Sequence, residues 1–482
     1  MTDLLLGTDL GTTSVKAGVF ARDGTQLARF AENYPTTRPA PGMCEQDPAD
    51  WIRLIDAAMN QFRAAGLVTS VRCGALTSQV NTHVFVDRTG RPLRPAILWQ
   101  DTRAMPEARE LNARITDAEK IALLGAPIPI DASHLLARML WVQRNEPEIW
   151  EKTAYVLLPK DYALLHLTGE LATDALSNIG LVGLDGNYVS AILGLVPGAM
   201  ERIAPLQSMT SLVGASRDGP PFAVATMDGW VGLAGAGACR ENAFAYLSGT
   251  SEILGLSSHT VTHEPGVVVF AEAQGQRLHA GPTQSGGASQ QWFCDVAGIA
   301  IPVMAKLVED NPLSRAPLFL PQLAGERAPV WNADLRGAFL GLEAGMQTAE
   351  FARAVYEGVA LSARHVLGAL EASGDLRATH LTCAGGGFRS DVWGQIRSDV
   401  LGRPLQRLAL AEAGVVGAAC IAAVASGLSE TLAQAHVPFS ESDREWEPDP
   451  NRRAFYDDLF EIYLEALKTT EGLGKRLAAL RP

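Results

Sequence analysis

The sequence has little that would support a metal-thiolate site or a disulfide framework. Its six cysteines are scattered singly along 482 residues, without the close pairs that a zinc site or a thiol redox motif requires. We therefore expect reduced thiols in a cytoplasmic protein. No uncharged apolar stretch is long enough to span a bilayer, and no basic segment followed by an apolar core opens the chain. Neither export nor membrane insertion is expected.

Positive charge is also scarce. Lysine and arginine number 40 against 53 aspartates and glutamates, which gives a net charge of −13. This balance disfavours sequence-independent binding to nucleic-acid backbones or anionic membrane surfaces. A phosphate ligand would need a metal ion or a local group of donors. The two commonest phosphate-binding signatures, G-x-x-x-x-G-K-[ST] and G-x-G-x-x-G, are both absent.

What the sequence does have is enough apolar residues, 47%, to bury large cores. At about 100–200 residues per domain, a chain of 482 residues predicts two or three domains. Strand-like and helix-like segments alternate, beginning with an antiparallel meander over residues 4–33 and a helix over residues 47–65. No Ser/Pro-rich linker separates the halves, so pattern alone predicts one domain over residues 1–241 and another over residues 242–482.

Two stretches about half a chain apart share one pattern, in which Gly and hydroxyl residues interrupt an apolar run. They are LLLGTDLGTTSVKAGVF (residues 4–20) and AFAYLSGTSEILGL (residues 243–256). Each predicts strand, tight turn and strand, and such a turn directs backbone N–H groups and hydroxyls into one concavity that suits a phosphate oxygen. Only the first contains a carboxylate at the strand end, Asp9, which could hold a hydrated Mg²⁺. An ordinary turn is the alternative for each stretch taken alone.

A third glycine cluster strengthens the phosphate interpretation. The segment CAGGGFRSDVWGQ places Gly385–Gly387 after an apolar strand and before a helix. Bare backbone in that context can approach a nucleotide closely. A plain strand-to-helix turn is again the alternative. Two phosphate turns and a later glycine turn together predict a nucleotide site shared by two related halves.

Several ordered motifs along nearly the whole chain resemble those of the FGGY family of carbohydrate kinases. They are GTDLGTTSVKAGVF, ILWQDTRA, LLPKDYALLHLTGELATD, ATMDGWVGLAGAG, YLSGTSEILG, LFLPQLAGERAP, AGGGFRSDVWGQIRSDVLGRPL and EAGVVGAACIAAVASG. The resemblance implies an α/β fold of two duplicated actin-like ATPase (ribonuclease H-like) domains with an interdomain cleft. It also implies ATP-dependent phosphorylation of a sugar or polyol hydroxyl.

The resemblance assigns roles to individual residues. Asp228, in MDGW, matches the family's general base, and a carboxylate at a strand-to-helix turn can accept the proton of a substrate hydroxyl. Read without the family, Asp228 could simply cap the next helix. Asp9 matches the metal-associated aspartate, so ATP and Mg²⁺ are the expected cofactors. The positions that match ATP-binding residues of the family are Gly11, Thr12, Thr13, Lys16, Gly249, Thr250, Gly286, Gly385 and Gly386.

The expected acceptor segment differs in sequence from the motifs known in the family. SQVNTHVFVD (residues 78–87) occupies a segment that resembles G-Q-M-H-G in xylulose kinases and N-Q-R-E-T in glycerol kinases. Here Val80 and Asn81 replace both the Met-His and the Arg-Glu pair. Loss of the Arg-Glu pair disfavours glycerol, because a fork donor and a charged acceptor are missing. Asp228-Gly229 is similar to the pair found in gluconate kinases.

Four residues are expected to bind the acceptor, which are Gln79, Asn81, Trp99 and Asp101. Trp99 offers an apolar face to the C–H surface of a sugar, and Asp101 can bind vicinal hydroxyls. Arg103 is expected to pair with Asp101 or another acid. His83 shares the strand side of Asn81 and either faces the pocket or is an ordinary buried or surface histidine.

The most favoured acceptor is a small sugar, a ketopentose such as xylulose. The alternatives are another polyol or sugar acid (gluconate, a tetritol, or glycerol as the least favoured), or a catalytically silent sugar or nucleotide sensor on the same fold. A small-molecule sugar or polyol is the expected partner, and neither nucleic acid nor a membrane is expected. The family resemblance allows a homodimer, and the sequence leaves the oligomeric state open.

Overall fold

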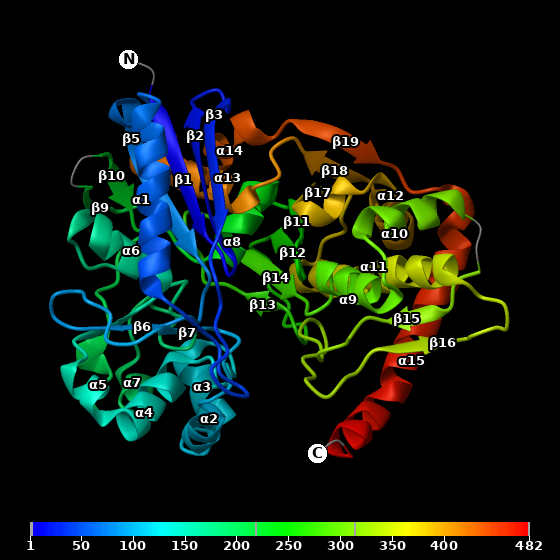
Figure 1. Cartoon of the computed structure of the whole chain (residues 1–482), viewed down its shortest axis with the longest axis horizontal. Coiled ribbons are helices and arrows are strands. Elements are labelled where there is room, and N and C mark those ends of the chain that lie inside the picture. Colours follow the sequence, from blue (N-terminus) through cyan, green and yellow to red (C-terminus); the bar gives the residue numbers. More distant parts are fainter. Residues whose placement is uncertain (1–2, 217–218, 313–314, 481–482) are drawn as a thin grey trace. The chain divides into compact units, whose positions relative to one another are not determined.

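Two mixed β-sheets, one in each of two units, organise the chain (Figure 1). The computed structural model describes residues 3–216, 219–312 and 315–480. Unit 1 comprises Met1–Gly235 and Gly414–Pro438, and unit 2 comprises Ala236–Ala413 and Phe439–Pro482.

The elements of unit 1 include a six-stranded sheet and two small two-stranded sheets. Its strands are β1 (Leu4–Leu10), β2 (Ser14–Ala21), β3 (Gln26–Asn33), β4 (Glu45–Gln46), β5 (Val71–Ser78), β6 (Val84–Val86), β7 (Ala96–Ile97), β8 (Tyr155–Leu157), β9 (Leu212–Ala215) and β10 (Pro221–Ala223). Its helices are α1 (Pro48–Ala64), α2 (Met105–Asn112), α3 (Asp117–Leu124), α4 (Leu135–Asn145), α5 (Pro147–Lys152), α6 (Pro159–Thr168), α7 (Ser190–Leu193), α8 (Asp228–Leu233), α13 (Ala413–Ala425) and α14 (Leu432–His436).

The elements of unit 2 include a seven-stranded sheet and one small two-stranded sheet. Its strands are β11 (Phe244–Ser248), β12 (Glu252–Ser257), β13 (Val268–Val269), β14 (Leu278–Pro282), β15 (Leu318–Leu320), β16 (Ala338–Leu340), β17 (Leu381–Ala384), β18 (Leu405–Leu408) and β19 (Ser442–Trp446). Its helices are α9 (Gly287–Ala297), α10 (Ile301–Asp310), α11 (Thr348–Gly374), α12 (Asp391–Leu401) and α15 (Arg453–Ala479).

The two large sheets repeat one topology. Unit 1 has the order β3-β2-β1-β5-β10-β9, and unit 2 has β13-β14-β12-β11-β17-β18-β19. In each sheet an antiparallel hairpin (β1–β2 or β11–β12) continues through parallel strands (β5 and β10, or β17 and β18) to an antiparallel edge strand. The repeat confirms the predicted duplicated α/β fold, both predicted hairpins and the predicted N-terminal meander.

Residues of β1 alternate between the two faces of the unit 1 sheet, as the pleat of a strand requires. Leu4 and Leu6 join the core that α1 and α6 supply, in which Trp51 and Phe62 are fully buried. Gly7 points to the other face, where a Cβ would lie 2.0 Å from the carbonyl oxygen of Val415 in α13. Only a residue without a side chain allows α13 to pack this closely on β1.

This packing explains why the division of the chain differs from the single boundary expected near Asn242. The segment Gly414–Pro438 belongs to unit 1, although the chain has by then passed through most of unit 2. Besides the contact at Gly7, a Cβ at Gly417 would lie 2.1 Å from the carbonyl oxygen of Val231. Close backbone contacts between segments distant in sequence are not visible in local apolar patterning.

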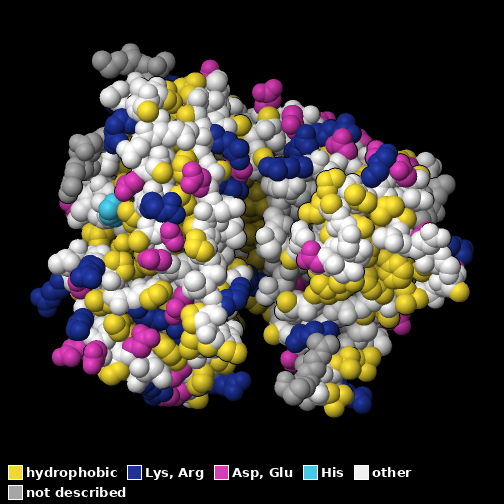
Figure 2. Space-filling model, in the orientation of Figure 1, with side chains coloured by type: hydrophobic (Ala, Val, Ile, Leu, Met, Phe, Trp, Pro, Cys, Tyr) yellow, Lys and Arg dark blue, Asp and Glu magenta, His cyan; other side chains and the backbone are white. Residues whose placement is uncertain are grey.

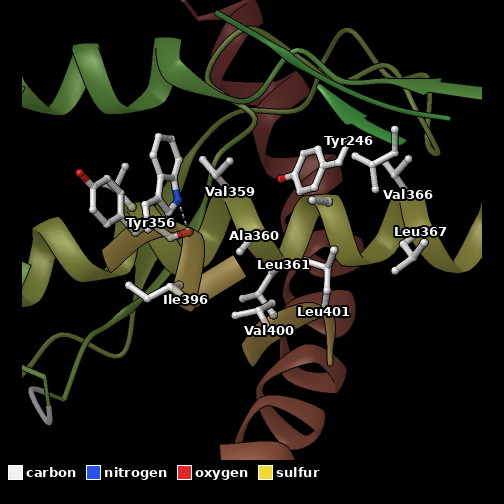
Figure 3. Close-up of a cluster of buried hydrophobic side chains, with 14 of the residues drawn as sticks. Tyr246, Tyr356, Val359, Ala360, Leu361, Val366, Leu367, Ile396, Val400 and Leu401 are labelled. Atoms are coloured by element: carbon white, nitrogen blue, oxygen red, sulfur yellow. Dashed lines mark hydrogen bonds between the residues drawn. The ribbon is translucent and has the colours of Figure 1, made fainter. Parts of the chain in front are cut away.

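The core of unit 2 is built around α11 and α12 (Figure 3). Tyr356 of α11 stacks on Trp393 of α12 with ring centroids 4.5 Å apart, and Trp393 Nε1 donates a hydrogen bond to the Tyr356 carbonyl at 3.2 Å. Figure 3 also shows Leu361 of α11 near Val400 of α12. This core supports the parallel strands β17 and β18, and the glycine cluster follows directly after β17.

The surface carries both signs of charge, interspersed over the visible face of each unit (Figure 2). Apolar side chains gather over α9 and α10, where Val296, Ile301 and Val303 are exposed. Among the described residues, no single helix is long and apolar enough to cross a membrane, and α9 with α10 passes that test only as a bent pair. All six cysteines are buried, and none of them forms a disulfide bond.

Candidate active site

The carboxyl ends of three parallel strands, β1, β5 and β10, bring the two predicted carboxylates of unit 1, Asp9 and Asp228, to one edge of its sheet. Leu10 is in register with Ser78, and Ser78 forms a parallel bridge with Met227. The Gln79 amide continues the ladder by donating to the Leu10 carbonyl at 3.0 Å. Asp9 and Asp228 therefore lie at the same edge, which is where open α/β sheets bind ligands.

Asp228 is the first residue of α8 and is partly buried. One of its carboxylate oxygens, Oδ1, accepts a hydrogen bond from the Gly229 amide at 2.8 Å. Burial is the largest cause, and the charge of Asp9 the second, of a rise in the pKa of Asp228 to about 7. A carboxyl group with that pKa can take up and release a proton near neutral pH.

The backbone that leads to Asp228 is held by a buried polar network. Thr77 Oγ1 donates to the Thr226 carbonyl at 2.6 Å, and Thr226 Oγ1 donates to Asp174 Oδ1 at 2.6 Å. The other oxygen of Asp174 pairs with Lys160 Nζ at 2.8 Å. Between β10 and this network, Ala225 adopts a left-handed conformation with φ of 55°, which is uncommon for a residue with a side chain. The network therefore fixes a strained turn three residues before Asp228.

Asp9 lies at the end of β1, opposite Lys16 in the register of the β1–β2 hairpin. The start of α13 lies close to its carboxylate, since a Cβ at Gly414 would be 2.6 Å from Asp9 Oδ2. The amino-terminal end of a helix favours a nearby negative charge. Asp9 thus lies beside the start of a helix, at the edge where Asp228 also lies.

The turn between β1 and β2 presents backbone donors. The Gly11 amide donates to the Ser14 carbonyl at 3.1 Å, and the hydroxyl of Tyr34 donates to the Gly11 carbonyl. Within the described residues, the backbone amides of Thr12 and Thr13 donate to no protein acceptor. The turn has the two successive backbone donors that a phosphate oxygen can use.

Two of the four expected acceptor contacts are partly exposed, Trp99 and Asn81. Trp99 Nε1 donates to Thr12 Oγ1 at 3.1 Å, so its indole lies beside the phosphate turn. Asn81 has a left-handed backbone with φ of 54°, and its amide donates to Ser133 Oγ at 3.3 Å. Both side chains remain candidates for contact with a sugar.

The structure gives internal roles to the other two, Gln79 and Asp101. Gln79 is fully buried, donates to Gln46 Oε1 at 3.0 Å and accepts from Thr82 Oγ1 at 3.2 Å. Asp101 is 1% exposed, and both of its carboxylate oxygens accept hydrogen bonds from Arg103 at 2.7–3.0 Å. Because these polar groups already have protein partners, we do not propose either residue as a direct acceptor contact.

The expected partner of Arg103 is present, and the position of His83 is now defined. Arg103 pairs with Glu45 at 2.8 Å as well as with Asp101. His83 is 3% exposed, lies 3.0 Å from Arg138 Nη1 and has a pKa well below its usual range because of burial. His83 and Asn81 line a polar cavity of about 20 Å³, which has room for about one water molecule. A sugar could not enter a cavity of that size.

In unit 2, the second hairpin turn lies against the start of α9. The Gly287 amide donates to the Gly249 carbonyl at 3.0 Å, and the Ala288 amide donates to the Thr250 carbonyl at 2.9 Å. A Cβ at Gly287 would lie 2.6 Å from the Gly249 carbonyl oxygen. The structure thus brings together the predicted positions Gly249, Thr250 and Gly286.

The glycine cluster after β17 joins the same edge of the unit 2 sheet. Gly385 has φ of +103°, and a Cβ there would lie 2.4 Å from the Ser248 carbonyl oxygen, whereas a Cβ at Gly386 would meet no atom within 4 Å. Arg397 joins the two turns, since its guanidinium donates to the Gly387 carbonyl and to Ser248 Oγ, each at 2.8 Å. Gly385 serves close backbone packing, and Gly386 borders open space.

Sequence reasoning missed the buried residues that brace these turns. In unit 1 they are Gln46 and Thr82, and in unit 2 they are Arg397 and its buried ion-pair partner Glu252. The available signal was the presence of Arg397 and Glu252 within predicted buried elements. Lys, Arg, Asp and Glu are rarely buried without a partner, so these two residues indicate an ion pair. No local pattern marks Gln46 or Thr82.

Comparison with known proteins places these features in a family. Residues 4–186 match the N-terminal domain, and residues 244–426 the C-terminal domain, of the FGGY family of carbohydrate kinases. A xylulose kinase of Escherichia coli (strain K12) is 30% identical, with 95% of this chain and 98% of that protein covered. A gluconokinase of Bacillus subtilis (strain 168) is 26% identical, with coverage of 92% and 94%.

A similar full-length match is found among solved structures. The crystal structure of a xylulose kinase from Rhodospirillum rubrum superimposes with a TM-score of 0.86 at 25% identity. It covers 98% of this chain and 99% of that one. The match supports the two-domain kinase fold over the whole chain.

Asp9→Asn should lower the pKa of Asp228 in the ligand-free protein without returning it to 3.8, because burial, the larger cause, remains. Titration of the aspartate carboxyl carbons by NMR measures this shift, and Asp56→Asn, an exposed carboxylate on α1, is the control.

Because the folded-state pKa is raised, ionisation of Asp228 costs stability as the pH rises through about 7. Asp228→Asn should therefore raise the melting temperature more at pH 8 than at pH 4. A pKa near 4 for Asp228 would contradict this account.

Proposed function

Since the chain belongs to the FGGY family of carbohydrate kinases, which phosphorylate sugars with ATP, we propose that its acceptor is a ketopentose such as xylulose and that Asp228 is the general base. The observation that carries the base assignment is the position of Asp228 at the carboxyl edge of the unit 1 sheet, with a pKa of about 7. The xylulose kinases among its relatives support the acceptor class.

In the proposed reaction, one carboxylate oxygen of Asp228 accepts the proton of the acceptor hydroxyl as that oxygen bonds to the γ-phosphorus. The bond from phosphorus to the bridging oxygen of ADP breaks at the same time, and the products are the sugar phosphate and ADP. The hydrogen bond from the Gly229 amide and the anchored Thr226 keep the carboxylate oriented. A base with a pKa near the working pH is suited to this transfer.

Asp9 is the residue that we propose to hold Mg²⁺. Mg²⁺ in kinases takes one or two carboxylates together with phosphate oxygens and water. The carboxylate of Asp9 at the end of β1, beside the amides of the phosphate turn, fits that requirement. The described residues contain no group of three or more His, Cys, Asp or Glu that could form an all-protein metal cage. When bound, the ion neutralises charge that develops on the phosphates.

The nucleotide contacts that we propose come from glycines, hydroxyls and one lysine. In unit 1 they are Gly11, Thr12, Thr13 and Lys16, and in unit 2 they are Gly249, Thr250, Gly286, Gly385 and Gly386. The turn of unit 1 offers amides to phosphate oxygens, and the open space beside Gly386 suits the rest of the nucleotide.

A neutral acceptor fits the charges around Trp99 better than a sugar acid does. The buried cations of this region already have partners: Arg103 pairs with Asp101 and Glu45, and Arg138 donates to the carbonyls of Asn81 and Ile97. Trp99 and Asn81 offer an apolar face and a neutral amide. A ketopentose needs no more charge than these residues supply.

Gluconate is the second candidate, and one observation favours it. Arg38 carries an exposed guanidinium that lies 3.4 Å from Gln100 Oε1, next to Trp99. A carboxylate could pair with this cation. The gluconokinase among the relatives is consistent with that possibility.

A coupled assay of ADP release across pentuloses, hexuloses, pentitols, tetritols, glycerol and gluconate tests the acceptor class. We expect the highest kcat/KM for a ketopentose, and expect Arg38→Met to leave that value within about twofold, because a neutral sugar needs no cation. A preference for gluconate that is lost in Arg38→Met would establish the second candidate. A preference for glycerol would contradict the interpretation of Val80 and Asn81, and sugar binding without any ADP release would indicate a sensor.

Asp228→Asn should lower kcat by about 10²–10⁴-fold, because an amide of the same size cannot accept the proton. The affinity for Mg-AMP-PNP, measured by calorimetry, should change little. Asp56→Asn on α1 is the matched control and should retain parental turnover. Near-normal turnover in Asp228→Asn would show that another group is the base.

Gly386→Val should raise the dissociation constant for Mg-AMP-PNP about tenfold or more, because the added side chain would occupy space that we assign to nucleotide. The melting temperature should hold, since a Cβ at Gly386 meets no protein atom within 4 Å. Gly368→Val, which also adds a side chain in open space but on α11, is the control. Unchanged nucleotide affinity in Gly386→Val would remove Gly386 from the site.

A further inference from the structure

Five residues of unit 1 form a closed ring of hydrogen bonds that joins the phosphate turn to the acceptor side. Trp99 Nε1 donates to Thr12 Oγ1 at 3.1 Å, and the Trp99 backbone amide donates to Thr82 Oγ1 at 3.2 Å. Thr82 Oγ1 donates to Gln79 Oε1 at 3.2 Å, and Gln79 Nε2 donates to Gln46 Oε1 at 3.0 Å. Gln46 Nε2 closes the ring by donating to the Thr12 carbonyl at 2.7 Å.

The ring gathers residues from separate elements. Thr12 is in the β1–β2 turn, Gln46 is in β4, Gln79 follows β5, Thr82 precedes β6, and Trp99 follows β7. Each side-chain amide has one orientation that satisfies the ring, since its oxygen accepts from one member and its nitrogen donates to the next. A change in the position of one member therefore leaves a polar group of its neighbour without its partner.

Three members of the ring, Gln46, Gln79 and Thr82, are too deeply buried to contact a ligand. Gln46 is 1% exposed, and Gln79 and Thr82 are both fully buried. Under the proposed function, the two remaining members are the ligand contacts, Thr12 for phosphate and Trp99 for the acceptor. The buried members connect these two contacts without touching either ligand.

We propose that the hydroxyl of Thr82 is a positioning group that holds the acceptor tryptophan and the phosphate turn in one fixed arrangement. This inference rests on the proposed function, because it takes Thr12 and Trp99 as ligand contacts. The hydroxyl occupies the junction of the ring, accepting from the Trp99 amide and donating to Gln79. Its removal breaks the buried path between the two contacts and leaves only their direct hydrogen bond, with both side chains still in the protein.

The test is Thr82→Val, which replaces the hydroxyl by a methyl group of similar size. The control is Thr153→Val, because Thr153 is also buried in unit 1 (3% exposed) and its Oγ1 makes one hydrogen bond, to the Ile149 carbonyl at 2.7 Å at the end of α5. Thr82→Ser, which keeps the hydroxyl, should restore the parental values. Gln46→Met breaks the ring at a second point and replaces Thr82→Val in the test if that variant does not fold.

We expect Thr82→Val to raise KM for both ATP and acceptor and to lower kcat/KM about tenfold, because small misplacements of binding groups have large kinetic effects. Thr153→Val and Thr82→Ser should stay within about twofold of the parent. A purely structural role would instead lower the melting temperature of Thr82→Val and Thr153→Val alike and leave both KM values unchanged. That result would overturn the inference.

Hydrogen exchange of the Trp99 indole N–H, observed by NMR and assigned with Trp99→Phe, tests the positioning role of Thr82 separately from the proposed function. In the free protein its hydrogen exchange should be faster in Thr82→Val than in the parent and unchanged in Thr153→Val. If the parent phosphorylates no acceptor, the proposed function fails, and this exchange rate alone decides whether Thr82 positions Trp99. Equal exchange in all three proteins would overturn the inference independently of turnover.

Discussion

The register of three parallel strands is the constraint on which unit 1 depends. Because Leu10, Ser78 and Met227 are neighbours across β1, β5 and β10, the residues that follow them emerge together at one edge of the sheet. That register brings Asp9 near Asp228, whose pKa is raised first by burial and second by the charge of Asp9. A slip by one residue would turn every side chain of the strand to the other face. Because Gly7 has no side chain, α13 can pack directly on β1, and this contact supports the sheet that carries the edge.

Unit 2 repeats the sheet but places different chemistry at the equivalent edge. In unit 1 the strand ends carry carboxylates, Asp9 and Asp228, whereas in unit 2 they carry glycines and the backbone of the Gly249–Thr250 turn. Two charged groups near that edge, Arg397 and Glu252, are buried and form an ion pair with each other. One scaffold is thus repeated, with carboxylates at its edge in unit 1 and bare backbone at its edge in unit 2.

Much of the fold could be predicted because the signals for it are local. The hairpins at residues 4–20 and 243–256 and the helix at residues 48–64 follow from apolar periodicity and turn residues, and Asp47 caps that helix. The roles of Gln79 and Asp101 could not be predicted, because their partners, Gln46 and Arg103, are set by tertiary packing. The same limit applies to Gly414–Pro438, whose return to unit 1 depends on close contacts at glycines.

The internal pairing of these side chains also limits how the acceptor can be recognised. Arg94 and Arg103 offset the charges of Asp101 and Glu45, so these four residues offer no net charge with which to select a sugar. Under the proposed function, discrimination would then rest on the indole face of Trp99 and the amide of Asn81, whose backbone holds an uncommon left-handed conformation. Apolar contacts separate related substrates by only about 1–3 kcal/mol per group, whereas an unpaired buried polar group rejects a substrate more strongly. Asn81 should therefore contribute more to the choice between neighbouring sugars than Trp99, whose flat face accepts any of them.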